Sequence, residues 1–84
     1  MKFKTKFTPQ FGKQLKKLKR RDKILLLRLK KKILEISENP HHYKPLKNIL
    51  KGTRRAHLDP FIIIFEIADD SIIFHYVSHH DEAY

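Results

Sequence analysis

The spacing of apolar residues changes along the chain, and each spacing predicts a different element. In residues 2–7 three lysines alternate with two phenylalanines and a threonine. This period of two predicts a half-buried strand whose lysines line a sheet edge or face a phosphate. Residues 61–67 and 72–77 are strongly apolar and rich in β-branched and aromatic side chains, which predicts two further strands. The polar turn 68–71 joins them, so we expect a β-hairpin.

Helical spacing, with three to four residues between apolar positions, dominates residues 9–37. We expect Thr8 to be the N-cap of a first helix and Pro9 its first residue, where the missing N–H costs nothing. Asp22 can cap a second helix, which the Asn-Pro pair at 39–40 ends. The residues expected to face the core are Phe11, Leu15 and Leu18 in the first helix and Leu25, Leu26, Leu29, Ile33 and Ile36 in the second.

A second apolar flank on the second helix consists of Ile24, Leu27 and Leu34. A helix that packs against both a sheet and a neighbouring helix needs two such flanks. We therefore expect the main stripe to cover the sheet and this flank to contact the neighbouring helix.

The short segment before the hairpin alternates in polarity. Ala56 and Leu58 share one face of an extended chain, whereas Arg55 and His57 share the other. If the small apolar pair faces the helices, then Arg55 and His57 lie on the opposite, open face of the sheet.

The chain of 84 residues is long enough for one core, so residues 1–84 are interpreted as one domain. A strand, a two-helix hairpin, a loop over 41–53 and a three-stranded antiparallel meander follow one another, which predicts the α+β class. We expect the first strand to join the meander in one mostly antiparallel sheet, with both helices on one face. The two helices should return the chain to the end that it left, so the first strand should pair antiparallel with a later one.

Charge is unevenly distributed along the chain. Residues 1–55 contain all 19 Lys and Arg and three acids, whereas residues 56–84 contain six acids and no Lys or Arg. Such a split favours a polyanion as partner, and nucleic acid first. A merely solvated basic face is the alternative interpretation.

Several classes of protein and site are disfavoured. The chain has no cysteine, so disulfides and thiolate chemistry are excluded. It has no apolar leader segment and no apolar run of membrane-spanning length, so we expect a cytoplasmic protein without membrane contact. The His41-His42 and His79-His80 pairs lack the spacing of zinc ligands, and there is no glycine-rich phosphate loop. We therefore expect neither a metal nor a small-molecule cofactor.

Candidate chemical groups lie at the ends of the hairpin. His57 precedes its first strand, whereas His79, His80 and Tyr84 follow its second, so strand pairing can bring them to one edge. Cleavage of RNA without a metal needs a base, an acid and a cation, and imidazole carries protons near neutral pH. His75 lies inside a strand and is expected to be structural, and His79 is expected to point away from His80.

The loop between the second helix and the hairpin mixes lysines with an aromatic residue, a combination that suits single-stranded RNA. A solvated linker is the alternative interpretation of this segment. With Arg55, the expected RNA contacts are Tyr43, Lys44, Lys47 and Lys51.

Three segments carry a resemblance to a known family. They are Pro45-Leu46, the run KGTRRAHLDP at 51–60 and the run HDEAY at 80–84. The YafQ branch of the RelE/ParE toxin superfamily has a similar proline-leucine pair, a Lys-Gly-aromatic-Arg-x-x-His-x-acid-Pro run at the same spacing, and a terminal Ser/Thr-His-x-x-x-aromatic. The opening run FTPQFGKQLKKL at 7–18 resembles the first strand and helix of the superfamily less specifically. The likeness covers essentially the whole chain.

This resemblance implies a toxin of a type II toxin-antitoxin system, a ribosome-dependent endoribonuclease that cuts mRNA and is held inactive by a cognate antitoxin. It implies His57 and His80 as catalytic histidines and Tyr84 as an aromatic residue that stacks on or positions the substrate. It also implies Arg54 as an arginine beside the cleft. Messenger RNA, the ribosome with its rRNA, and the antitoxin are the partners that follow.

Three positions differ from the YafQ-like pattern. Lys44 precedes Pro45 where YafQ-like toxins have a histidine, and Phe61 and Ile62 replace an acid and a tryptophan. These differences keep open an alternative function. It is a catalytically weak binding module of the same fold, which acts through RNA, gyrase or its antitoxin.

Overall fold

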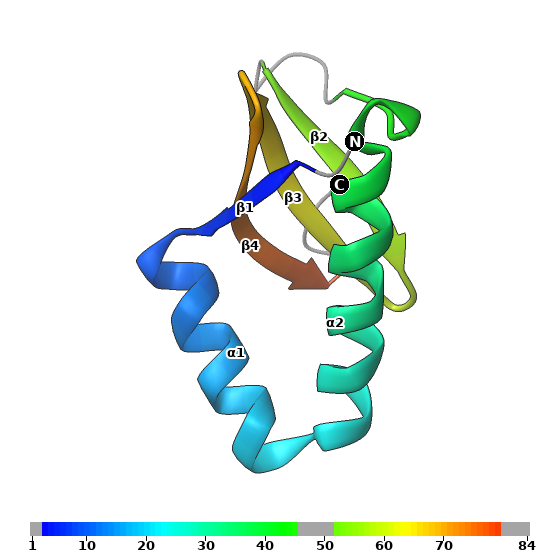
Figure 1. The fold of residues 1–84 in the computed structure, drawn as a ribbon. Coiled ribbons are helices and arrows are strands. Elements are labelled where there is room, and N and C mark those ends of the chain that lie inside the picture. Colours follow the sequence, from blue (N-terminus) through cyan, green and yellow to red (C-terminus); the bar gives the residue numbers. More distant parts are fainter. Residues whose placement is uncertain (1–2, 46–51, 80–84) are drawn as a thin grey trace.

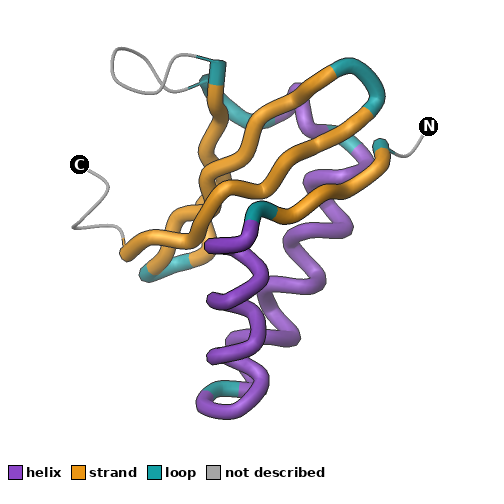
Figure 2. The backbone as a smooth tube through the Cα atoms, turned by 90° about the vertical axis from the view of Figure 1, so that its left-hand side faces the viewer, coloured by secondary structure: helices purple, strands orange, loops and turns teal. Residues whose placement is uncertain are grey.

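The computed structural model describes residues 3–45 and 52–79. Their strands and helices follow one another in the expected α+β order (Figure 1). Both helices lie on the same side of the sheet (Figure 2), as the sequence predicted. In chain order the elements are β1 (Lys4–Phe7), α1 (Pro9–Arg21), α2 (Lys23–Glu38), the 3₁₀ helix η1 (Pro40–His42), β2 (Thr53–Leu58), β3 (Phe61–Ala68) and β4 (Ser71–His79).

The four strands form one sheet in the order β1-β4-β3-β2. The meander is antiparallel as expected, and β3 is a central strand, but β1 pairs with β4 in parallel. The predicted antiparallel pairing of the first strand is therefore wrong. The reason is that α2 carries the chain back past the end of β1 to its beginning, where the Phe3 N–H donates to the Ser37 carbonyl at 2.9 Å. β2 consequently runs in the direction of β1, and two reversals give β4 the same direction.

Strand β1 is more exposed than the half-buried strand that the sequence predicted. All four of its residues are exposed, because β1 is an edge strand and two of its side chains are lysines. Phe7 remains 47% exposed even though its ring stacks on Phe11 with centroids 5.3 Å apart. Phe3, just before the strand, packs against the core instead.

Thr8 joins β1 to α1 and also ties this corner to β4. Its hydroxyl accepts from the Phe11 N–H at 3.1 Å, as expected of an N-cap, and donates to the His75 carbonyl at 2.7 Å. Pro9 occupies the first turn, as predicted. The start of α1 is therefore fixed by one local and one long-range hydrogen bond.

Helix α2 begins at the predicted cap, where the Leu25 N–H donates to Asp22 Oδ1 at 3.0 Å. Its main stripe is buried as predicted, through Leu26, Leu29, Ile33 and Ile36. The predicted second flank is wrong, because Ile24, Leu27 and Leu34 are exposed rather than packed on a neighbouring helix. The side of α2 that carries these three residues faces solvent.

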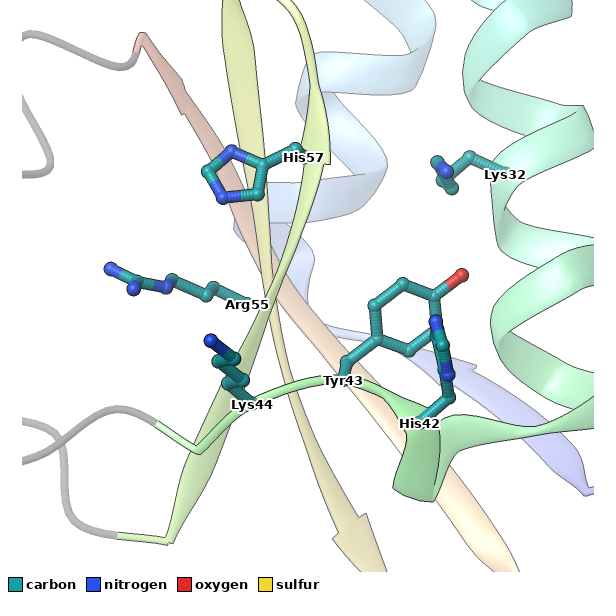
Figure 3. A pocket seen from close by; sticks show the side chains of 6 residues that line it. All are labelled: Lys32, His42, Tyr43, Lys44, Arg55 and His57. Atoms are coloured by element: carbon teal, nitrogen blue, oxygen red, sulfur yellow. The ribbon is translucent and has the colours of Figure 1, made fainter.

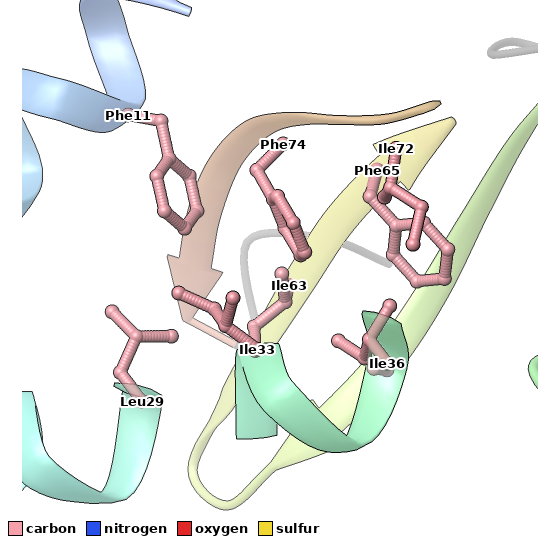
Figure 4. Packing of buried hydrophobic residues seen from close by; sticks show 9 residues of the cluster. Phe11, Leu29, Ile33, Ile36, Ile63, Phe65, Ile72 and Phe74 are labelled. Atoms are coloured by element: carbon pink, nitrogen blue, oxygen red, sulfur yellow. The ribbon is translucent and has the colours of Figure 1, made fainter. Parts of the chain in front are cut away.

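The core lies between the helices and one face of the sheet (Figure 4). Phe11 of α1 points toward Phe74 of β4, with ring centroids 5.5 Å apart, and Phe74 in turn meets Phe65 at 5.9 Å. Ile62 and Ile64 are buried as well, although they alternate onto the other face of β3. The apolar character of β3 on both faces thus follows from its central place in the sheet.

The β3–β4 hairpin closes with the two-residue turn Asp69-Asp70, in which Asp69 has a φ of 55°. Aspartate tolerates this left-handed conformation better than most residues. A bulge at Ile64/Phe65 shifts the register of β4, and near it His75 Nε2 lies 2.6 Å from Glu66 Oε1. Among the described residues, no helix is long and apolar enough to span a membrane.

Candidate functional site

The alternation predicted for β2 separates its side chains onto two faces. Ala56 is fully buried in the core against the helices, and Leu58 packs against the same cluster. His57 is exposed and Arg55 is half-buried. Because side chains alternate along a strand, Arg55 and His57 share the face of the sheet that the helices leave open, as the sequence indicated.

The segment after η1 runs along the outer edge of β2. The Arg55 N–H donates to the Lys44 carbonyl at 3.2 Å, and Pro45 forms a bridge with Arg54. These two backbone contacts hold Lys44 beside Arg55. The predicted RNA contacts Lys44 and Arg55 are thus brought together with His57, two residues beyond Arg55 on the same face.

A hollow of about 330 Å³ lies at this edge of the sheet (Figure 3). Three of its lining residues are cations, two are histidines and one is a tyrosine, and none of the described lining residues is acidic. An anionic ligand therefore suits this hollow electrostatically. We call it the edge pocket, and its lining residues are Lys32, His42, Tyr43, Lys44, Arg55 and His57.

Arg54 lies apart from His57. Its Nη1 donates to the Tyr43 carbonyl at 2.7 Å, and its position in β2 places it on the face that carries Ala56. The structure therefore does not bring Arg54 into the edge pocket. The neighbouring arginine, Arg55, lies there with His57.

The Tyr43 side chain packs partly against the hydrophobic core. Its ring meets Phe65 edge-on with centroids 5.9 Å apart, and the His42 ring meets it in the same way at 5.3 Å. Lys32 of α2 places its ammonium 6.0 Å from the centre of the Tyr43 ring. The tyrosine is half-buried and lines the pocket from the helix side, so its ring is held in place by its neighbours.

Four residues that the sequence singled out lie outside the described residues: His80 and Tyr84 of the proposed catalytic set, and Lys47 and Lys51 of the proposed RNA contacts. The positions that differ from the YafQ-like pattern are described. Ile62 is fully buried, and Phe61 meets the His79 ring edge-on at 5.6 Å.

Sequence reasoning missed two residues of the edge pocket, Lys32 and His42. Lys32 belongs to the polar side of a helix, and its approach to β2 depends on how α2 crosses the sheet edge. In the sequence His42 stands out only as half of an adjacent histidine pair. Its place in the loop directly before the proposed RNA contacts Tyr43 and Lys44 was the available signal.

Metal-ligating groups do not gather in the part of the chain that the structure describes. Within residues 3–45 and 52–79, no three His, Asp or Glu side chains are arranged so that they could hold an ion. The chemistry that these described residues offer is proton transfer by imidazole and binding of anions by lysine and arginine.

Solved toxins share this fold. The toxin-antitoxin complex RelBE2 from Mycobacterium tuberculosis matches with a TM-score of 0.82 and 23% identity, covering 94% of this chain and 92% of the other. YafQ from Escherichia coli matches with a TM-score of 0.74 and 25% identity, covering 98% of each chain. The arrangement of a helix hairpin over a four-stranded sheet is therefore that of a small toxin.

The sequence comparisons give the family. The model of the ParE toxin of the type II parDE toxin-antitoxin system matches residues 5–84. A protein of Methanocaldococcus jannaschii described as a candidate toxin, RelE4, is 40% identical over 79 residues, which span 90% of this chain and 84% of the relative. The chain belongs to the RelE/ParE superfamily of type II toxins, which confirms the resemblance drawn from its sequence.

Proposed function

We propose that this toxin is a ribosome-dependent endoribonuclease that cleaves mRNA without a metal. The observation that supports this most directly is the joint placement of His57, Arg55 and Lys44 in the edge pocket. A proton carrier beside two cations supplies one of the two proton-transfer groups and the positive charge that RNA cleavage requires. The family resemblance supplies the substrate class.

The reaction begins with attack of a ribose 2′-OH on the adjacent phosphorus. One group must remove the 2′-OH proton, another must protonate the departing 5′ oxygen, and a cation must stabilise the charge that builds on the phosphate oxygens. We assign proton transfer to His57 and His80, with Arg55 and Lys44 at the phosphate. Tyr84 stacks on or positions a base.

Arg54 has a supporting role in this proposal. Its guanidinium holds the Tyr43 carbonyl, one residue before Lys44. The Lys44 carbonyl in turn accepts a hydrogen bond from the Arg55 N–H. Arg54 therefore positions the segment that carries Lys44 and does not act on the phosphate itself.

A cognate antitoxin is the second proposed partner. The RelBE2 structure is a complex of toxin and antitoxin, and the parDE family is defined as a toxin-antitoxin system. The net charge of this chain, +10, favours an acidic partner. We infer that an antitoxin binds and neutralises this protein.

Expression without and with the antitoxin, followed by mapping of mRNA 5′ ends, tests the proposal. We expect growth arrest and new 5′ ends in translated messages, both suppressed by the antitoxin. His57→Gln should lower the cleavage rate by about 10² to 10⁴ at equal protein level. In a purified system, cleavage should require ribosomes.

A catalytically weak binding module is the second candidate, and specific observations favour it. Ile62 is fully buried and Phe61 packs on His79 at the two positions where YafQ-like toxins carry an acid and a tryptophan. Lys44 occupies the position where YafQ-like toxins have a histidine. Growth arrest without new mRNA 5′ ends would support action through binding of RNA, gyrase or the antitoxin instead.

A further inference from the structure

Helix α2 exposes three large apolar side chains to solvent. Ile24 is 75% exposed, Leu27 is 67% exposed and Leu34 is 51% exposed. Single exposed apolar residues are common on protein surfaces, but a group of them on one element marks a contact site. Their arrangement on the helix indicates which kind of partner this contact site fits.

These three residues follow a heptad pattern. With Lys31 and Glu38 they occupy the spacing of three, four, three and four residues that forms one continuous stripe along a helix. The buried residues of α2 lie on nearly the opposite side, at about 100° per residue. We call residues 24, 27, 31 and 34 the outer stripe. It is a seam of the width that a second helix covers.

The charges beside the outer stripe are mainly positive. Lys31 lies within it, and the charged residues at the flanking positions of the heptad are Lys23, Arg28, Lys30 and Glu35. Lys23, Lys30 and Lys31 are exposed, so they are available to a partner, whereas the Arg28 guanidinium already donates to the Asp59 carbonyl at 3.1 Å. An approaching helix therefore needs apolar residues at its centre and acids on the side that meets Lys23 and Lys30.

We propose that the outer stripe binds an acidic amphipathic helix of the cognate antitoxin. The identity of the partner rests on the proposed function, whereas the chemistry of the helix follows from this surface. A second copy of the chain is disfavoured because two such faces would bring their lysines together. RNA would use the lysines and leave the three apolar side chains in water.

This surface is separate from the edge pocket. Lys32 is the described α2 residue that lines the pocket, and it is not part of the outer stripe. The antitoxin is thus held by a face of α2 that takes no part in the proposed RNA chemistry. Variants in the stripe should therefore escape the antitoxin while they keep their toxicity.

Calorimetry with the purified cognate antitoxin tests this inference. We expect the double variant Ile24→Ser/Leu27→Ser and the charge reversal Lys31→Glu each to weaken binding about tenfold or more. Lys17→Glu makes the same charge change at an exposed position of α1 and should stay within about twofold of the parent. Circular dichroism should show parent-like folding for all variants, because the altered side chains are exposed.

Unchanged antitoxin affinity in both stripe variants would overturn the inference. A loss of RNA binding or self-association in the double variant, with antitoxin affinity retained, would overturn it as well and identify the other occupant. In cells without antitoxin, the double variant should arrest growth like the parent. If neither the parent nor the double variant arrests growth or cleaves mRNA, the proposed catalysis is wrong. The calorimetry still tests the docking site in that case.

Discussion

The side-chain amide of Gln14 makes two hydrogen bonds with the backbone of Val77. Its Nε2 donates to the Val77 carbonyl at 2.8 Å, and the Val77 N–H donates to its Oε1 at 2.8 Å. Strand β1 pairs with β4 no further than Phe7 and Phe74. The amide of Gln14 therefore acts in place of a neighbouring strand and fixes β4 just before residue 80.

Replacement of Gln14 by alanine should destabilise the protein. Both the N–H and the carbonyl of Val77 would lose their partner, and unsatisfied groups of this kind cost about 1–3 kcal/mol. Urea denaturation of Gln14→Ala measures this loss. Gln10→Ala, at an exposed position of the same helix, is the matched control and should change the free energy of unfolding by less than about 0.5 kcal/mol.

The two adjacent arginines of β2 should respond differently to substitution. Arg54→Ala removes the hydrogen bond to the Tyr43 carbonyl and should lower stability by about 1–2 kcal/mol. Arg55→Ala should weaken RNA binding and reduce the slope of log affinity against log salt by about 0.7, the value for one phosphate on a single strand. Anisotropy titrations with a labelled single-stranded RNA at several salt concentrations measure the slope.

The reverse result would contradict this assignment. If Arg54→Ala lost the salt dependence while Arg55→Ala kept it, the phosphate contact would belong to the helix-side face. The family-derived role of Arg54 beside the cleft would then be restored.

His42 should contribute to cleavage although the family pattern does not include it. It lines the edge pocket together with His57, so its imidazole lies near the place proposed for the phosphate. His42→Gln should lower the single-turnover rate on ribosome-bound mRNA by about tenfold or more. His41→Gln changes the neighbouring exposed histidine, whose ring meets Phe3 instead, and should leave the rate unchanged. Equal rates for both variants would exclude His42 from the chemistry.

Asp70 and Lys4 form an exposed ion pair with a defined pH dependence. Lys4 Nζ lies 3.5 Å from Asp70 Oδ2, and this charge, helped by the Ser71 hydroxyl, lowers the pKa of the Asp70 carboxyl. A lowered pKa means that the contribution to stability is present above the unfolded pKa of about 3.9 and is lost as the pH falls through the folded value. In an NMR titration, Lys4→Met should raise the pKa of Asp70, and no change would contradict the pairing.

The sequence predicted the features that depend on neighbouring residues. Thr8 and Asp22 cap their helices because a hydroxyl or carboxylate three positions before a free N–H can reach it without help from the rest of the fold. The faces of Ala56 and His57 followed from alternation in the same way. Local geometry is enough for each of these features.

Features that depend on how the elements meet in space could not be read in this way. The direction of β1 relative to β4 depends on whether α2 returns the chain to the beginning or to the end of β1. Apolar periodicity shows that Ile24 and Leu27 share a flank, but it cannot show whether anything within the chain covers that flank. Lys32 reaches β2 only through the crossing of α2 over the sheet edge, so its place in the pocket has no signature in the sequence around it.

The pairing of β1 with β4 also sets when this protein can fold during its own synthesis. Lys4 pairs with Ser71, so the first strand stays unpaired until residues 71–74 have left the ribosome. At about 5–20 residues per second, the two strands emerge roughly 3–13 s apart. The helices meanwhile lack the central strand that they cover, so the nascent chain has no finished sheet. The sheet of this toxin therefore stays incomplete for those seconds after β1 has emerged, however early its helices form.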